Sequence, residues 1–126
     1  MTADWTEMAR NLRAGLREMR SGMPDVMRAF SGIAQAALQA KALDTKTKEL
    51  IALAISVAVR CDDCIAFHAK AAVDQGATSD EIRETLSMAI YMGAGPSVMY
   101  AVHALDACKE FAQIKKEEGV TDAGQT

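Results

Sequence analysis

The most reactive side chains of the sequence lie close together, in the segment Cys61-Asp62-Asp63-Cys64-Ile65-Ala66-Phe67-His68. A cysteine thiolate is a nucleophile and a metal ligand, and a neighbouring histidine can exchange protons with it. If the segment is helical, Cys64 and His68 lie on one face, with their Cβ atoms about 5–6 Å apart. The spacing therefore predicts a chemical site at Cys61, Cys64 and His68.

Three interpretations of this cluster stay open on the residues alone. We favour a thiol–disulfide redox site, because it explains two close cysteines and an adjacent base. A zinc site would use Cys61, Cys64 and His68, but structural zinc takes four ligands, and only the distant His103 or Cys108 could complete the set. The third interpretation is a buried, inert trio. We expect Cys108 to be a small core side chain and His103 to be a core or interface histidine.

The place of Cys61 relative to the helix decides whether the two cysteines can form a disulfide. A disulfide requires Cβ atoms about 3.5–4.5 Å apart, slightly closer than two such positions inside a regular helix. We therefore expect Cys61 at the helix cap or in its first turn, where the positive end of the helix dipole favours a thiolate. The charges of Asp62 and Asp63 oppose that thiolate, although acidic residues are typical of a first turn.

Glu49 is a further candidate because it opens a very apolar stretch of the chain ahead of Cys61. If that stretch forms a central helix, the carboxyl group is partly desolvated and becomes a candidate proton acceptor. Alternatively, Glu49 is an ordinary glutamate at a helix start, solvated beside Lys46 and Lys48. The sequence alone leaves both interpretations open.

The elements that position these residues are expected to be helices, in an all-α fold of about six. Half of the residues are hydrophobic but only 5% are aromatic, with eight Met and two Pro, a mixture that suits close-packed helices. Apolar periodicity and cap residues predict helices over residues 4–20, 24–41, 45–59, 61–75, 78–92 and 96–118. The polar residues 119–126 are expected to form a frayed tail.

Several of these helices have patterns that assign their faces and their starts. The helix after Glu49 is apolar nearly all round, so it should lie at the centre of the domain. Asp44 or Thr45 can cap this helix, and Thr78 with Glu81 predicts a capping box for the fifth. The first helix has an apolar stripe and, beside it, a stripe of arginines. We interpret the arginine stripe as a face that is exposed to solvent. The second helix has an expected inner face formed by Met27, Phe30, Ile33, Ala34, Ala37 and Leu38.

Length and composition bound the remaining possibilities. The 126 residues predict a single domain over residues 1–126. A net charge of −3 gives no support to a nucleic-acid partner, and the longest apolar stretch is too short to cross a membrane. No secretory signal is visible at the N-terminus, so we expect a cytoplasmic protein. In that compartment a close cysteine pair is typical of catalysis or metal binding rather than of a structural disulfide.

The segments Lys46–Leu50 and Arg60–His68 together resemble the AhpD-like family, the alkylhydroperoxidase-type branch of the carboxymuconolactone decarboxylase superfamily. The shared pattern is a glutamate, eleven intervening residues and then Cys-x-x-Cys-x-x-x-His, and the resemblance covers roughly residues 25–110. It implies an AhpD-like helical domain and a redox proton relay formed by Glu49, Cys61, Cys64 and His68. It also implies a homo-oligomer, either a trimer or a hexamer built as a trimer of dimers.

The activity that this resemblance implies is peroxide reduction by a dithiol, without a metal or a cofactor. Glu49, acting through His68 or a water, would take the proton from Cys64, whose thiolate attacks a small peroxide substrate. Cys61 would resolve the sulfenic acid as a disulfide, which a lipoyl-type or thioredoxin-like dithiol reduces. The reverse assignment of the two cysteines stays open.

Two features of the sequence limit what can be carried over from the family. The best-known alkylhydroperoxidases have a further histidine between the cysteines, where this chain has Asp63, so equal efficiency and the same reductant do not follow. The decarboxylases of the superfamily lack the cysteine pair. The alternatives are a decarboxylase-like lactone enzyme that uses His68 and Glu49, and a non-enzymatic thiol redox sensor.

Overall fold

The computed structural model describes residues 4–125, with side chains for residues 4–119, and this part of the chain is helical without a strand. The all-α prediction is therefore confirmed. In chain order the helices are α1 (Trp5–Gly22), α2 (Pro24–Leu38), α3 (Thr45–Ala58), α4 (Asp62–Asp74) and α5 (Ser79–Gln125). No helix in the described residues is long and apolar enough to cross a membrane.

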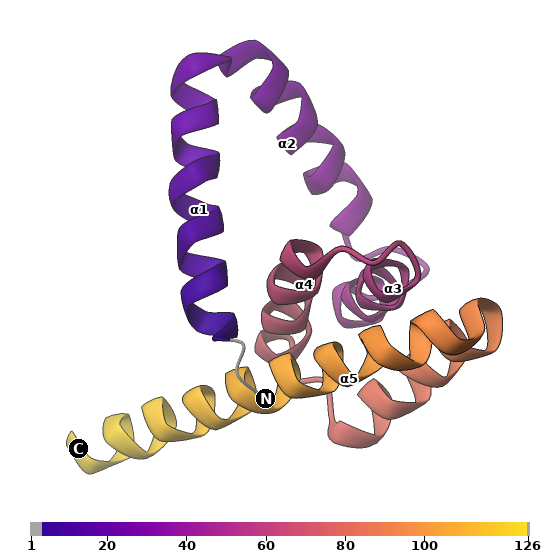
Figure 1. The fold of residues 1–126 in the computed structure, drawn as a ribbon. Coiled ribbons are helices and arrows are strands. Elements are labelled where there is room, and N and C mark those ends of the chain that lie inside the picture. The colour runs from indigo at the N-terminus through magenta and orange to yellow at the C-terminus, as the bar shows by residue number, and fades with distance from the viewer. Residues whose placement is uncertain (1–3, 126) are drawn as a thin grey trace.

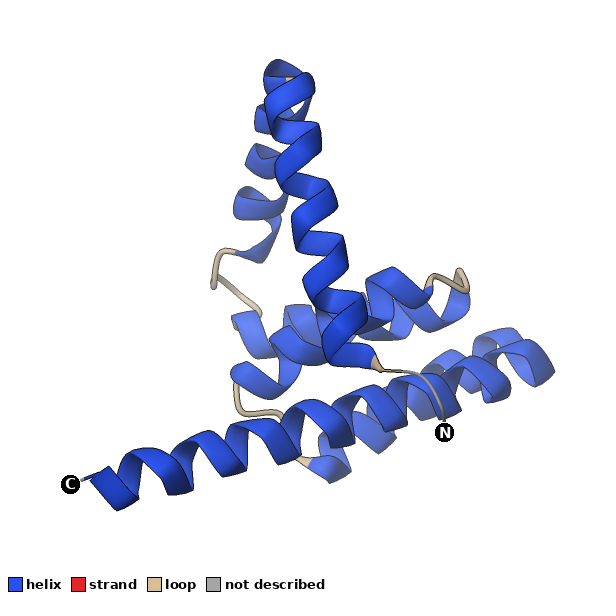
Figure 2. Ribbon diagram, turned by 60° about the vertical axis from the view of Figure 1, so that its left-hand side comes forward, coloured by secondary structure: helices blue, strands red, loops and turns tan. Residues whose placement is uncertain are grey.

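The element α5 consists of two helices that meet at Ala94, where φ is 54° and ψ is −138°. The chain turns back at this point, so the two halves of α5 lie side by side (Figures 1 and 2). The six predicted helices are thus present, with the expected break inside the segment 93–96. Pro96 lies in the first turn of the second half, where a proline is tolerated, so the helix continues past it. This half continues to Gln125, well beyond its expected end, and Thr126 lies outside the described residues.

The helices α3, α4 and α5 form a compact body around the core of the protein. Leu53, Val57 and Ile65 are fully buried there. The central place of α3 follows from its sequence, since a helix that is apolar nearly all round must be covered on most sides. The predicted caps are confirmed: Asp44 accepts a hydrogen bond from the Thr47 amide (2.7 Å), and Thr78 and Glu81 form a reciprocal capping box.

The helices α1 and α2 form a hairpin that projects away from this body (Figures 1 and 2). The hairpin is fixed at its base, where Trp5 is 1% exposed and its indole N–H donates to Asp106 Oδ2 (2.8 Å). Farther out, its apolar side chains have less cover. The base of α1 thus belongs to the core, whereas most of the hairpin does not.

The predicted inner face of α2 is wrong for the single chain. Only Met27 is buried, whereas Phe30 is 61% exposed and Ile33 is 66% exposed. The helix also ends at Leu38, a few residues before its expected end near Lys41. The physical reason is that helical periodicity shows which face of a helix is apolar but not what covers that face. In α2 most of the apolar face is left uncovered by the rest of its own chain.

Candidate redox site

The two neighbouring cysteines form a disulfide at the N-terminus of α4, with an S–S distance of 2.07 Å. Cys61 is the N-cap residue of α4, in extended conformation, and its Sγ accepts a hydrogen bond from the Cys64 amide (3.1 Å). The prediction that Cys61 lies at the cap is confirmed. An extended cap residue turns its side chain back over the first turn, which brings the two sulfur atoms together.

The end of α3 holds Cys61 in this position through the backbone. The Cys61 amide donates to the Ser56 carbonyl oxygen (3.0 Å), and the Ser56 hydroxyl bonds back to Ala52 in its own helix (2.7 Å), as predicted. Arg60, between the two helices, has a φ of 60°. A left-handed conformation at a residue other than glycine costs about 1–3 kcal/mol. This strained turn was not predicted, because an arginine gives no signal for positive φ.

Glu49 and His68 meet beside the disulfide. Glu49 Oε2 lies 2.7 Å from His68 Nδ1, and Glu49 is only 4% exposed. A carboxylate can only accept, so Nδ1 carries the hydrogen and Nε2 is left as the acceptor of a neutral His68. His68 follows Cys64 by one turn of α4, so the contact between Glu49 and His68 joins α3 to α4 one helical turn from the disulfide.

The interpretation of Glu49 as a solvated residue beside Lys46 and Lys48 is wrong. The two lysines have other partners: Lys46 Nζ pairs with Glu81 (2.8 Å), and Lys48 Nζ donates to the Gln39 carbonyl oxygen (2.5 Å). Because Glu49 lies on the face of α3 that packs against α4, its carboxylate is turned towards His68 and away from water.

The remaining candidates from the sequence, His103 and Cys108, have different surroundings. Cys108 is a free, buried thiol, and desolvation raises its pKa to about 12, as expected for a core side chain. His103 comes from the second half of α5, and its Nδ1 lies 3.0 Å from Oδ1 of Asp62, the residue after Cys61. This contact was missed, since nothing in the sequence links positions so far apart.

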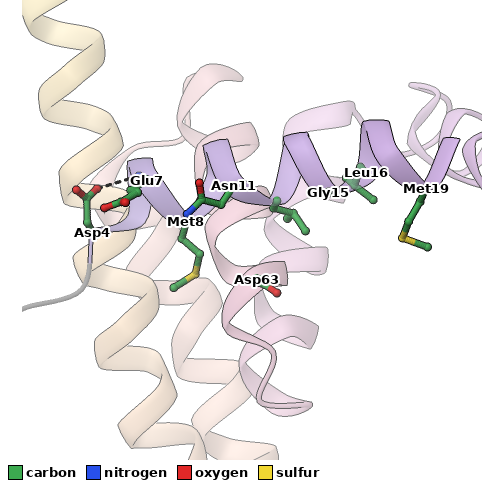
Figure 3. A pocket seen from close by; sticks show the side chains of 9 residues that line it. Asp4, Glu7, Met8, Asn11, Gly15, Leu16, Met19 and Asp63 are labelled. Carbon is green, nitrogen blue, oxygen red and sulfur yellow. Dashed lines mark hydrogen bonds between the residues drawn. The ribbon is translucent and has the colours of Figure 1, made fainter. Parts of the chain in front are cut away.

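A groove of about 820 Å³ runs along α1 and reaches the segment between the cysteines. Figure 3 shows Asp63 beneath α1, on the side of the groove formed by the start of α4. Apolar side chains of α1 line its length, and the carboxylates of Asp4 and Glu7 lie at one end (Figure 3). The lining residues are Asp4, Glu7, Met8, Asn11, Leu12, Gly15, Leu16, Met19 and Asp63.

The geometry gives the interpretations of the cluster unequal support. Cys61 and Cys64 are joined to each other. The two distant residues that could complete a zinc site have other surroundings, since His103 pairs with Asp62 and Cys108 is buried in the core. Among the described residues, no three His, Cys, Asp or Glu side chains are grouped as metal ligands would be. A disulfide beside a buried carboxylate–imidazole pair can exchange electrons and protons, which is the chemistry of a redox site.

Comparison with known proteins gives a consistent result. The sequence model that describes the carboxymuconolactone decarboxylase family matches residues 24–107 of this chain. An uncharacterized protein of Cupriavidus necator is 38% identical over 105 residues, which cover 83% of this chain and 93% of that protein. An uncharacterized protein of Haemophilus influenzae is 37% identical over 107 residues, with coverage of 85% and 95%.

Two solved structures are similar along most of the chain. An apo carboxymuconolactone decarboxylase family protein from Legionella pneumophila has a TM-score of 0.84 and 48% identity, covering 86% of this chain and 96% of its own. A family protein from Thermotoga maritima, for which a role in the antioxidative response has been suggested, has a TM-score of 0.79 and 31% identity, with coverage of 87% and 94%.

Proposed function

The chain belongs to the carboxymuconolactone decarboxylase family, and from this premise we propose that it is a peroxide-reducing dithiol oxidoreductase of the alkylhydroperoxidase type. One observation carries the proposal: the buried Glu49 is hydrogen-bonded to His68 (2.7 Å), one turn from a cysteine that is joined to its neighbour in a disulfide. The antioxidative role suggested for the Thermotoga maritima relative agrees with it.

The reaction begins with the reduced pair of thiols. Glu49 holds His68 with Nε2 free to take the proton of Cys64, directly or through a water. The Cys64 thiolate attacks one oxygen of the peroxide ROOH, the O–O bond breaks, and RO⁻ leaves as an alcohol once it gains a proton. Cys64 is then a sulfenic acid.

The second half of the cycle restores the thiols. Cys61 attacks the Cys64 sulfur, the S–O bond breaks and water leaves, giving the disulfide. An external dithiol, of lipoyl or thioredoxin-like type, reduces this disulfide by exchange and becomes a disulfide itself. The protein needs no metal and no cofactor for these steps, and we place it in the cytoplasm, where such dithiols are kept reduced.

The decisive test is peroxide consumption in the presence of a dithiol donor, with a thiol count after one equivalent of peroxide. We expect two thiols to be lost per chain, with Cys108 unchanged. Cys64→Ser should consume peroxide at least about 1,000-fold more slowly, since the nucleophile is gone. Cys108→Ser, which removes the third sulfur, is the matched control and should keep the parent rate.

Other outcomes would point to the alternative functions. If Cys64→Ser keeps the parent rate, the assigned mechanism is wrong. A lactone-converting enzyme would keep its activity in Cys64→Ser and lose it in Glu49→Gln. A redox sensor would lose two thiols with peroxide but show no turnover with any dithiol donor. Each of these results contradicts the proposed enzyme.

We also propose that the protein is a homo-oligomer, either a trimer or a hexamer. The support is the apolar surface that one chain leaves open, on α2 and near the turn of α5, where Tyr91 and Met92 are exposed. Large contiguous apolar patches are uncommon on soluble monomers. Phe30→Ser should reduce the sedimentation coefficient without loss of helix content, whereas a parent protein that sediments as a single chain contradicts the proposal.

A further inference from the structure

We propose that His103, paired with Asp62 as a second imidazole–carboxylate pair, offsets the charge of that carboxylate and so favours Cys61 as a thiolate in the step that closes the disulfide. This inference rests on the proposed function, since it assigns Cys61 the resolving role. It makes the site two-sided: Glu49 and His68 act on Cys64, and Asp62 and His103 act on Cys61. Neither Asp62 nor His103 is needed for the attack on peroxide.

The pair is a defined contact between two distant parts of the chain. His103 Nδ1 lies 3.0 Å from Asp62 Oδ1, and both side chains are about half-buried. The imidazole ring is fixed by two aromatic neighbours, Trp5 (centroid distance 6.0 Å) and Tyr100 (5.1 Å). Trp5 is in turn bonded to Asp106. His103 is therefore held in place by groups other than Asp62, which suits a positioning residue.

The local charges explain why Cys61 needs such a partner. Cys61 Sγ already accepts the Cys64 amide hydrogen at the positive end of α4, and both effects favour a thiolate. The adjacent Asp62 carboxylate opposes it, since a nearby like charge disfavours ionisation. His103 donates its Nδ1 hydrogen to this carboxylate, because a carboxylate only accepts. The bond draws the negative charge of Asp62 towards α5.

Other charged groups surround this end of α4 and do not replace His103. They come from the loop before α4, from α4 itself, from the relay with α3 and from the α1 side of the groove: Arg60, Asp63, His68, Glu49, Asp4 and Glu7. Four of these six are acidic and raise the negative charge at the site. Of the two basic groups, His68 is bonded to Glu49, and Arg60 forms no ion pair with Asp62 among the described residues. His103 is therefore the basic group that contacts Asp62.

The step that benefits is the attack of Cys61 on the Cys64 sulfenic acid. The Cys61 thiolate supplies the electron pair of the new S–S bond, the S–O bond breaks, and hydroxide takes up one proton and leaves as water. The sulfenic sulfur is the internal oxidant, so no further reactant is needed. The rate of this step follows the thiolate fraction of Cys61.

The test isolates Cys61 as the one thiol of the 126-residue chain, in a Cys64→Ser/Cys108→Ser background. The rate of alkylation by iodoacetamide is measured from pH 5 to 10, and its midpoint reports the ionisation of Cys61. We expect His103→Leu to raise the midpoint by about half a unit to one unit, which is roughly three- to tenfold slower alkylation at neutral pH. His103→Asn retains an N–H donor near the Nδ1 position and should restore most of the parent rate.

A double-mutant cycle distinguishes this role from a structural one. Asp62→Asn should lower the midpoint, and His103→Leu should have almost no effect when Asp62 is already Asn. If His103→Leu changes thermal stability but not the midpoint, or shifts the midpoint equally in both backgrounds, the proposal is overturned. Should His103→Leu fail to fold, Asp62→Asn alone decides, because a midpoint that does not fall contradicts the proposal.

Alkylation uses no peroxide, so the two proposals fail separately. A protein without peroxide turnover but with the expected midpoint shifts loses the proposed function and keeps the paired site around Cys61. If turnover is normal but the midpoint does not change in the His103 and Asp62 variants, the proposed function stands and the role of the pair at Cys61 is overturned.

Discussion

The body formed by α3, α4 and α5 and the hairpin formed by α1 and α2 contrast in what covers their apolar side chains. In the body, Leu53, Val57 and Ile65 are enclosed by neighbouring helices of the same chain. In the hairpin, Phe30 and Ile33 have equally apolar side chains but are mostly exposed. The disulfide and the Glu49–His68 pair lie in the body, so the chemistry depends on the part of the molecule that is packed within one chain.

One amphipathic pattern therefore has two physical meanings in this molecule. A buried face stabilises the fold of the chain itself, whereas an exposed face can only contribute once another surface covers it. Substitutions in the body should therefore act on unfolding, and substitutions in the hairpin should act on association. Four experiments test this division, in decreasing order of the change that each should produce.

The first compares a core residue with a hairpin residue of similar size. Leu53→Ala should lower the free energy of unfolding by about 2–5 kcal/mol, because it removes buried methyl groups and leaves a cavity. Ile33→Ala should lower it by an amount that grows with protein concentration, since it acts through association. Urea denaturation over a hundredfold range of concentration measures both. A concentration-independent loss in Ile33→Ala would contradict the division.

The second experiment tests the contact of Trp5, at the base of the hairpin, with the body. Trp5→Phe removes the indole N–H that binds Asp106 and reduces a fully buried ring, so we expect a loss of about 2–3 kcal/mol. Limited proteolysis should then cut α1 and α2 before the body. Met19→Leu, at the far end of α1, is the control and should leave the cleavage pattern unchanged. Equal cleavage of both regions in Trp5→Phe would show that the hairpin is not a separate unit.

The third concerns the turn within α5, which belongs wholly to the body. A Cβ atom on Gly93 would lie 1.9 Å from Ser97 Oγ and 2.9 Å from Ser97 Cβ, and Ser97 is buried. Gly93→Ala should therefore cost about 1–3 kcal/mol through overpacking. Gly95→Ala has open space around its added atom and serves as the control. The difference between their melting temperatures measures the effect, and equal values would contradict it.

The smallest effect is the pH dependence of the helix starts in the body. The hydrogen bonds of Thr47 lower the pKa of Asp44, and the bond from Lys46 lowers the pKa of Glu81. A lowered folded-state pKa means that this stabilisation is present above the ordinary values of 3.8 and 4.5 and is lost as the pH falls through the folded values. Melting curves of Asp44→Asn/Glu81→Gln should thus approach those of the parent near pH 2 and fall slightly below them at pH 6.

The sequence was a good guide wherever the controlling interactions are local. The caps at Asp44 and Thr78, the bond of Ser56 to its own helix and the place of Cys61 at a helix start all depend on residues within a few positions of one another. Their geometry follows from rules about helix ends, so these features could be predicted before any tertiary structure was known.

Contacts between distant segments could not be predicted in the same way. The burial of Glu49 depends on how α3 packs on α4, and the bond between His103 and Asp62 depends on the return of α5 across the body. The positive φ of Arg60 has no signature in its residue type. The exposure of Phe30 was missed because periodicity gives no information on the partner of an apolar face.

The contact of Trp5 with His103 gives the protein an internal optical reporter. Trp5 is the one tryptophan of the sequence, and its ring lies 6.0 Å from that of His103, which is bonded to the residue after Cys61. The tryptophan fluorescence of the chain therefore arises beside the His103–Asp62 pair, at the Cys61 end of the disulfide. Emission recorded in a stopped-flow instrument can follow that side of the site during the reaction without an added label.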